Sequence, residues 1–170
     1  NIDPTYTQGD LAKQRQATIH RLTEDGVMEL QQSLVVPSLV RRVAVISAID
    51  AAGYGDFCDQ LMNNRCGYKY ELSLFSAIMQ GDHAPKSIIA ALNQIATEED
   101  KWDIVVIIRG GRATTDLGCF DDYELASHCA QFPLPILSGI GHTRDTSIVD
   151  MVVHRCVKTP TAAAEWLIEH

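Results

Sequence analysis

The order of apolar and polar positions divides the chain into strand-like and helix-like segments that alternate. Compact apolar runs rich in β-branched residues predict four strands, at residues 41–48, 69–79, 102–111 and 133–141. Stretches with helical spacing predict helices between and after them, around residues 54–65, after 81–87, at 121–132 and from about Asp145 onward. Strands and helices that alternate in this way are typical of a mainly parallel sheet.

A further helix is predicted before the first strand. Residues 7–25 place Leu11, Ile19 and Leu22 on one helical face, and a connector follows them. The sequence therefore predicts the α/β class, with a mainly parallel sheet of about four or more strands, helices on both faces and a preceding N-terminal helix. We divide the chain into the N-terminal helix with its connector, residues 1–40, and an α/β domain, residues 41–170.

The composition fits a globular protein of the cytoplasm. Hydrophobic residues make up 46% of the 170 residues, which is enough to bury one sizeable core. No apolar run reaches the roughly 18 residues that a membrane span needs, and the first residues lack the pattern of a signal peptide. The five cysteines are widely spaced without a C-x-x-C pair, so reduced thiols are expected. We expect a cytoplasmic location and no membrane partner.

The charge balance limits how this chain could bind nucleic acid. A formal net charge of −8 argues against a surface that holds DNA unaided, because that affinity comes mainly from Lys and Arg at phosphates. Several cations nevertheless lie near two Gly-rich segments, namely Arg109, Arg112, Arg144, Arg155 and Lys158. This distribution is compatible with a focused positive site within an acidic chain.

The first Gly-rich segment follows the third predicted strand. In open parallel sheets, ligands bind beyond the carboxyl ends of the strands, where loops offer free backbone N–H groups. Arg109 stands at the end of this strand, and Gly110 and Gly111 allow the backbone to approach an anion closely. By themselves, the two glycines fit a tight turn with a solvated arginine equally well.

The second Gly-rich segment, "SGIGHTRDTSIVD", follows the fourth predicted strand. His142 is the first bulky polar residue after the apolar run, and Asp145 lies three residues further on. An arginine at one strand end and a His/Asp pair at the other would supply positive charge and a proton-transfer group for phosphoryl chemistry. The structural alternative makes Asp145 a helix cap and His142 a packed or exposed imidazole.

Several motifs occur in the same order as in a known family and cover nearly the whole chain. They are "IDPTYTQGDLAKQR", "RRVAVISA", "MQGDHAPKSI", "RGG" with a later "FDD", "GIGHTRDTSIVD" and "KTPTAAAE". The Gly-His-x-x-Asp and Thr-Pro-x-x-Ala-Ala-Glu pieces are the most specific. On these motifs the chain resembles the large-subunit family of bacterial exodeoxyribonuclease VII.

The resemblance implies an exonuclease that degrades single-stranded DNA to short oligonucleotides together with several copies of a small subunit. Members of the family also have an N-terminal OB-fold that binds the strand, and a long helical region after the catalytic domain. We therefore expect this chain to be the catalytic part. Residues 1–40 would lead from the OB-fold, and the helical region would bind the small subunit.

The resemblance also implies the site residues. The catalytic set corresponds to Asp56, Arg109, His142 and Asp145, and the phosphate- or substrate-binding positions beside it are Gly110, Gly111, Arg112 and Arg144. Arg109 would stabilise charge on the scissile phosphate, and His142 would act as general base or acid. Asp145 would orient His142 or, with Asp56, hold a divalent ion such as Mg²⁺, and a metal-independent site is equally compatible. Without the resemblance, Asp56 is interpreted as a solvated helix residue.

The chain departs from the family pattern at several positions. Arg112 and Ala113 replace a Gly and a Ser after Arg-Gly-Gly, and Thr143 stands where a Glu commonly follows Gly-His. His154 and Cys156 stand where an acid and a base are expected. These changes argue against a Glu-dependent metal site. We interpret the chain as a divergent lineage that keeps the core catalytic set. The missing Glu, the acidic charge balance and the lack of a Walker-type or GxGxxG motif favour one alternative, a non-catalytic α/β module that binds a nucleotide or another phosphorylated ligand. A third possibility is a subunit-interaction domain.

Overall fold

The computed structural model describes residues 8–48, 52–64, 67–79, 81–109, 118–140 and 147–169. Within these ranges, five strands form one parallel sheet: β1 (Arg42–Ser47), β2 (Glu71–Ser76), β3 (Ile104–Ile108), β4 (Ile136–Gly139) and β5 (Arg155–Cys156). The α-helices are α1 (Gln8–Glu24), α2 (Ala52–Met62), α3 (Ala84–Ala96), α4 (Tyr123–Ala130), α5 (Ile148–Val152) and α6 (Pro160–Glu169). Short 3-10 helices are η1 (Gln31–Ser33), η2 (Glu99–Lys101) and η3 (Gly118–Asp121). The predicted α/β class and the four predicted strands are confirmed.

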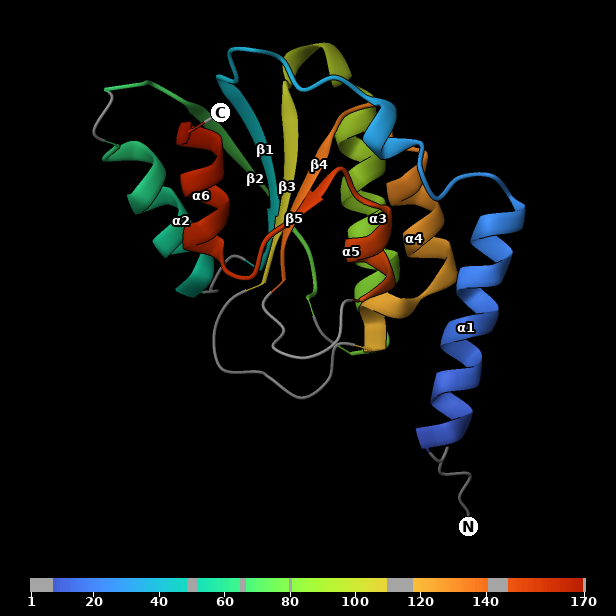
Figure 1. Ribbon diagram of the computed structural model, residues 1–170. Helices are drawn as coiled ribbons and strands as arrows, with labels where there is room; N and C mark the ends of the chain where they lie inside the picture. Colours follow the sequence, from blue (N-terminus) through green and yellow to red (C-terminus); the bar gives the residue numbers. More distant parts are fainter. Residues whose placement is uncertain are drawn as a thin grey trace.

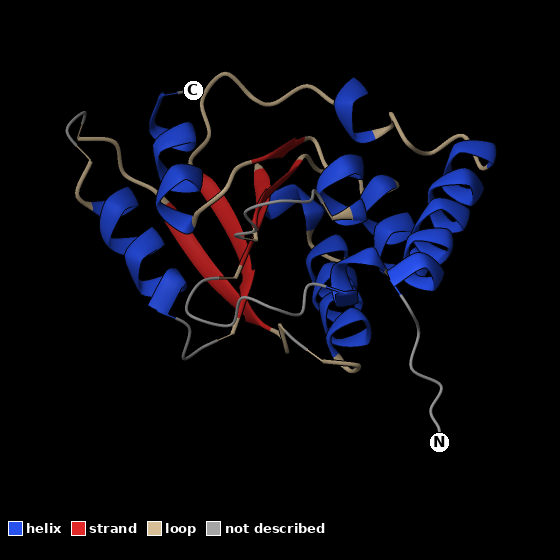
Figure 2. Cartoon of the chain, turned by 60° about the horizontal axis from the view of Figure 1, so that its bottom comes forward, coloured by secondary structure: helices blue, strands red, loops and turns tan. Residues whose placement is uncertain are grey.

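Both faces of the sheet are covered by helices. Because successive side chains of a strand point to opposite faces, Val43 and Val45 pack in one apolar core and Ala44 and Ile46 in another. Helices α2 and α6 contribute to the first core, and α3, α4 and α5 to the second, as Figure 1 shows. Figure 2 shows the strands between these two helical layers. Burial on both faces explains why every residue of β3 is apolar.

The strand order identifies the carboxyl end of the sheet as the expected position of a binding site. The order is β2-β1-β3-β4-β5, so the direction in which strands are added reverses between β1 and β3. In parallel sheets, a reversal of this kind leaves a crevice at the carboxyl ends of the two strands. Arg109 directly follows β3 and therefore lies at this carboxyl edge.

The elements after β4 differ in part from the sequence prediction. The helix predicted from about Asp145 is observed only as the short α5. The chain then forms β5, which no apolar pattern in the sequence predicted. β5 exists because Arg155 and Cys156 pair with Leu137 and Ser138 of β4. Helix α6 begins at Pro160, as the Thr-Pro signal predicted.

The cap of α5 also corrects a prediction. The N-cap is Ser147, whose Oγ accepts the backbone N–H of Asp150 at 3.2 Å. The structural alternative that made Asp145 the cap is therefore wrong. A serine followed three residues later by an acidic residue is a common helix start, and that signal was present in "TSIVD".

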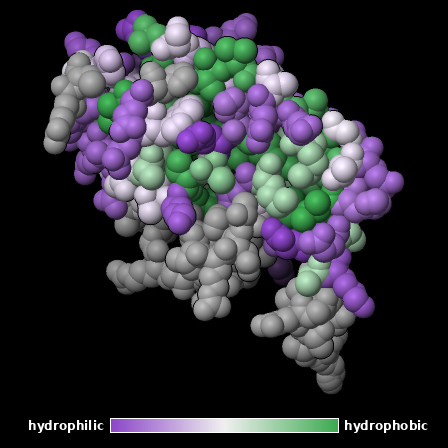
Figure 3. Space-filling view, in the orientation of Figure 1, coloured by the Kyte–Doolittle hydropathy of each residue, from purple (hydrophilic) through white to green (hydrophobic). Residues whose placement is uncertain are grey.

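The N-terminal helix packs against the second helical layer. Leu22 is fully buried in the same core as Leu125 of α4, and the guanidinium carbon of Arg21 lies 3.7 Å from the ring centre of Tyr123. None of the described helices is both long and apolar enough to cross a membrane. On the side shown in Figure 3, hydrophilic and apolar residues are interspersed over the surface.

Candidate functional site

Arg109 is a buried cation at the carboxyl edge of the sheet. Only 6% of its surface is exposed, and its backbone N–H donates to the carbonyl oxygen of Gly139 at 3.1 Å. Among the described residues, no carboxylate forms an ion pair with its guanidinium. Burying a cation is costly unless an anion accompanies it. The position therefore suits the binding of a negatively charged group such as a phosphate.

The two segments predicted to form the site begin and end beside each other. They are residues 110–117 and 141–146, and both lie outside the described residues. Where they begin, Arg109 and Gly139 are joined by the backbone hydrogen bond described above. Where they end, the backbone N–H of Ile148 donates to the carboxylate of Asp121 at 2.8 Å. The tertiary structure thus links the segment after β3 to the segment after β4 at both ends.

Most of the predicted site residues belong to these two segments. Gly110, Gly111, Arg112, His142, Arg144 and Asp145 therefore lie outside the described residues, as do Ala113 and Thr143. Their predicted roles stay predictions. Of the predicted set, the structure describes Arg109 and Asp56.

Asp56 lies in the second turn of α2 and is exposed. This location agrees with its interpretation from sequence alone as a solvated helix residue. Within the described ranges, its carboxylate forms no ion pair, so the structure does not join it to Arg109. Its proposed catalytic role is supported only by the resemblance.

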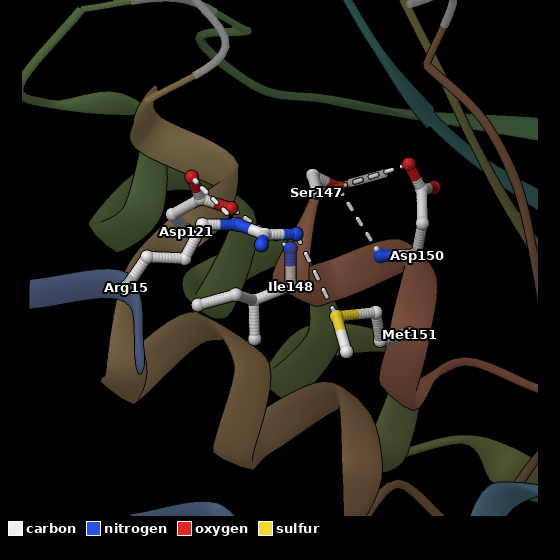
Figure 4. Close-up of polar contacts among 6 residues, drawn as sticks. All are labelled: Arg15, Asp121, Ser147, Ile148, Asp150 and Met151. Atoms are coloured by element: carbon white, nitrogen blue, oxygen red, sulfur yellow. Dashed lines mark hydrogen bonds and ion pairs between the residues drawn. The ribbon is translucent and has the colours of Figure 1, made fainter. Parts of the chain in front are cut away.

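A buried hydrogen-bond network next to these segments was not predicted. Ser138 of β4 donates its hydroxyl to Oδ1 of Asp150 at 2.6 Å, and Ser147 Oγ lies 2.9 Å from Oδ2 of the same carboxylate. Ser138 is fully buried, and Ser147 and Asp150 are each 5% exposed. Figure 4 shows Ser147 and Asp150 at the start of α5. The spacing of Ser147 and Asp150 signalled a cap, whereas no local pattern could join Ser138 to them.

The "FDD" motif has a structural role. Phe120 is fully buried, and Asp122 caps α4 by accepting the backbone N–H of Leu125 at 3.0 Å. Asp121, which accepts the N–H of Ile148, also lies 3.8 Å from Nε of Arg15 in α1 (Figure 4). The motif therefore joins η3, α4, α5 and α1.

The "KTPTAAAE" motif brings the start of α6 to the same edge of the sheet. Thr159 Oγ1 accepts the backbone N–H of Ala162 at 3.0 Å. A Cβ on Gly139 would lie 3.1 Å from the carbonyl oxygen of Thr159, which is closer than an ordinary van der Waals contact, so a glycine favours this approach. Ala163 and Ala164 are fully buried, which confirms the close-packed first turn expected from the alanines.

The two later departures from the family pattern, His154 and Cys156, lie at β5 and just before it. Nε2 of His154 is 3.1 Å from the carbonyl oxygen of Leu34 in the connector. Cys156 is exposed on β5, at one margin of the sheet. His154 thus contacts the connector, whereas Cys156 pairs with Ser138 of β4.

Burial raises the pKa of three described cysteine thiols, Cys58, Cys129 and Cys156, which lowers the fraction of reactive thiolate near neutral pH. Burial, reinforced by the negative charge of Asp150, raises the pKa of the Cys129 thiol to about 12. Burial likewise raises the pKa of the Cys58 thiol. In the described ranges, no three or more His, Cys, Asp or Glu side chains lie close enough together to hold a metal ion.

The comparisons with known proteins converge on one family. The family model described as "Exonuclease VII, large subunit" matches residues 27–170. The exodeoxyribonuclease 7 large subunit of Acaryochloris marina is 37% identical over 146 residues, which are 85% of this chain and 34% of that protein. The protein of the same name from Deinococcus radiodurans is 36% identical over 99% of this chain and 41% of its own length. The one from Lactobacillus acidophilus is 34% identical over 98% of this chain and 36% of its own length. The chain thus spans about two fifths or less of the length of these curated relatives. It belongs to the exonuclease VII large-subunit family.

Proposed function

We propose that this chain is the catalytic part of an exodeoxyribonuclease that hydrolyses phosphodiester bonds of single-stranded DNA to short oligonucleotides. The observation that carries this proposal is the buried Arg109 at the carboxyl edge of the sheet, without a carboxylate paired to it in the described ranges. The names of the relatives support the reaction class, because each is called an exodeoxyribonuclease. Since the chain spans only part of each relative, the activity is proposed for a longer large subunit that contains it.

Arg109 would act on the phosphate itself. Its planar guanidinium can donate two hydrogen bonds to the non-bridging oxygens and stabilise the charge that grows on them in the transition state. The bond to Gly139 fixes the backbone from which the Arg109 side chain extends, and burial would restrict the guanidinium before the substrate arrives. Such preorganisation is what makes electrostatic stabilisation effective.

The proton transfers would fall to His142 and Asp145. Hydrolysis forms a bond between a water oxygen and phosphorus and breaks the bond from phosphorus to one sugar oxygen. One proton leaves the water, and one reaches the departing oxygen. A histidine suits either transfer near neutral pH, and an aspartate three residues away can orient its imidazole. We propose these roles for His142 and Asp145 on the sequence motif.

Both a Mg²⁺-assisted and a metal-independent reaction are compatible with the sequence. Mg²⁺ prefers carboxylate oxygens, and Asp56 together with Asp145 would supply them. The ion would polarise the phosphate and lower the pKa of a bound water.

The proposed partners are single-stranded DNA and several copies of a small subunit. The family description "large subunit" supports a smaller partner. The net charge of −8 supports the proposal that most of the affinity for DNA comes from parts of the assembly other than this chain.

The test uses the complete large subunit with its small partner and end-labelled single-stranded DNA, with and without EDTA. Arg109→Ala should lower kcat/KM about 100- to 1,000-fold, as expected when a donor to the developing charge is lost. Arg109→Lys should retain part of the wild-type kcat/KM, because the positive charge remains while the bidentate hydrogen-bond geometry is lost. His142→Ala should abolish cleavage and leave DNA binding largely intact. Loss of cleavage in EDTA would indicate that the reaction requires a metal ion.

The matched control is Arg41→Ala, since Arg41 is exposed directly before β1, at the amino edge of the sheet. Its turnover should stay within about twofold of the wild type. Near-normal turnover of Arg109→Ala would refute the assignment of Arg109. Intact DNA with the wild-type complex would refute the nuclease. Thermal stabilisation of that inactive protein by a mononucleotide would then favour the ligand-binding module.

A further inference from the structure

Asp150 joins the end of β4 to the start of α5. Its carboxylate accepts hydrogen bonds from Ser138 at 2.6 Å and from Ser147 at 2.9 Å. The backbone N–H of Asp150 in turn donates to Ser147 Oγ at 3.2 Å. All three residues are at least nine-tenths buried, so water does not compete strongly for these bonds.

The two serines stand on opposite sides of residues 139–146. Ser138 is the residue before Gly139, and Ser147 is the residue after Thr146. One carboxylate thus holds the place where the chain leaves β4 and the place where it enters α5. Between these places lie the two residues to which the proton transfers were assigned, His142 and Asp145.

The start of α5 depends on such tertiary bonds. The helix has five residues, and a helix this short does not form stably on its own, because the first turn fixes several residues for one hydrogen bond. The Ser147–Asp150 cap holds it from one direction, and the carboxylate of Asp121 holds the N–H of Ile148 from another (Figure 4). The direction in which the chain enters α5 therefore follows from these contacts.

The same network lies next to the proposed phosphate-binding residue. Ser138 precedes Gly139, whose carbonyl oxygen accepts the backbone N–H of Arg109 at 3.1 Å. A shift of Ser138 would move the end of β4 and, through Gly139, the backbone of Arg109. Asp150 is thus connected both to Arg109 and to the two ends of the segment with His142 and Asp145.

We propose that Asp150 is a positioning residue of the active site, which fixes the end of β4, and through Gly139 the backbone of Arg109, relative to the start of α5. This inference rests on the proposed nuclease function and adds to it a residue that does not touch the substrate. A buried carboxylate is costly in free energy, and an apolar side chain would often serve stability as well or better. Its presence is explained by the geometry that it imposes.

The matched control is Asp103 at the opposite, amino edge of the sheet. Its carboxylate accepts the backbone N–H groups of Arg41 and Arg42, each at 2.9 Å, and the guanidinium of Arg42 at 3.2 Å. It is therefore a comparable polar anchor between strand ends, far along the strands from Arg109. Loss of either anchor should lower stability, but only loss of Asp150 should affect the reaction.

The first experiment compares Asp150→Asn, Ser138→Ala and Asp103→Asn in the complete large subunit with its small partner. Asp150→Asn should lower kcat on single-stranded DNA at least tenfold while KM changes less than about threefold. Ser138→Ala removes one bond to the carboxylate and should lower kcat in the same direction by a smaller factor. Asp103→Asn should lower Tm by an amount similar to Asp150→Asn and leave kcat within about twofold.

The second experiment does not depend on activity. Hydrogen–deuterium exchange of the complete large subunit, followed in peptides that cover residues 136–140 and 147–152, should be faster in Asp150→Asn than in the wild type. Asp103→Asn should leave the exchange of these peptides unchanged. Failure of the wild-type complex to cut DNA would refute the proposed function, and the exchange data would still test the anchor.

Two results would overturn the inference. One is an Asp150→Asn variant with lowered Tm and normal kcat, which would make the network purely structural. The other is unchanged exchange of these peptides in that variant, because the anchor would then not hold the end of β4 to the start of α5.

Discussion

The side chain of Gln31 is fully buried against the start of β4, where its amide oxygen accepts the backbone N–H of Ile136 at 2.8 Å. Its amide nitrogen donates to the carbonyl oxygens of Phe132 and Leu134 at 3.0 and 2.9 Å. One side chain of the connector thus completes the hydrogen bonding of the chain that leads into β4. The connector is therefore bonded to the sheet's amino edge.

Gln31→Ala should lower the free energy of unfolding by about 2–4 kcal/mol, because it leaves one buried backbone N–H and two carbonyl oxygens without this partner. Urea unfolding followed by circular dichroism measures the change. Gln131→Ala is the matched control, since the exposed side chain of Gln131 bonds to Ser127, one helical turn earlier, and not across the fold among the described residues. Its effect should stay within about 0.5 kcal/mol. Equal effects of the two substitutions would contradict the bridging role.

Gly139→Ala and Gly55→Ala should have opposite effects on stability. A Cβ on Gly139 would lie 3.1 Å from the carbonyl oxygen of Thr159 and 3.3 Å from Cγ2 of Ile108, so the backbone before α6 or the Ile108 side chain must shift slightly. A loss of about 1–3 kcal/mol is expected. A Cβ on Gly55 meets no atom within 4 Å, and in a helix alanine is favoured over glycine by about 0.5–1 kcal/mol. Thermal unfolding of both variants checks the signs, and a stabilised Gly139→Ala would disprove the close packing of α6 on β4.

The stability contribution of Asp103 should depend on pH. Burial on its own would raise the pKa of Asp103, but hydrogen bonds from the backbone N–H groups of Arg41 and Arg42 and from the Arg42 guanidinium lower it below the usual value. A carboxyl whose pKa is lower in the folded than in the unfolded chain stabilises the protein above the unfolded pKa of about 3.9. That stabilisation is lost as the pH falls through the folded pKa. Asp103→Asn should therefore be less stable than the wild type at pH 7, and the difference should shrink below about pH 4.

Urea unfolding at a series of pH values measures this difference. Asp100→Asn, which removes an exposed carboxylate in η2, controls for the change in net charge. A constant difference between Asp103→Asn and the wild type across the whole range would rule out the lowered pKa.

Cys129 should resist alkylation in the folded protein. With a pKa of about 12, caused by burial and then by the charge of Asp150, roughly one thiol in ten thousand is ionised at pH 8. Cys156 is exposed on β5 and should react first. Iodoacetamide labelling at pH 8, read by peptide mass spectrometry with and without denaturant, separates the two. Labelling of both residues at one rate in the native protein would contradict the burial of Cys129.

The sequence predicted the elements that local pattern governs. β1, β3 and β4 were recognisable as β-branched apolar runs because both faces of the sheet are covered, and the start of α6 followed from Thr159 and Pro160. β5 was missed because Arg155 and Cys156 carry no apolar pattern, and only their pairing with β4 makes them a strand. An edge strand of so few residues can be recognised only from its hydrogen-bonded pairing with the neighbouring strand.

The site shows the same division. The position of Arg109 at a strand end could be predicted, since the apolar run before it is unmistakable, whereas its burial could not. Ser147 and Asp150 were recognisable as a capping pair, but Ser138 joins them only because β4 and α5 meet in space. Asp56 is exposed as sequence alone suggested, so its catalytic role stays a prediction from the resemblance.

By itself, the sequence determined the α/β class, the order of most elements and the family, because periodicity and short motifs are local properties of the chain. Only the tertiary structure decided which polar groups meet. It joined Gln31 to Ile136, Asp121 to Ile148 and Asp150 to Ser138. The physical reason is that a buried polar group must find a partner wherever the packed sheet and helices bring one, and that partner can lie anywhere along the chain.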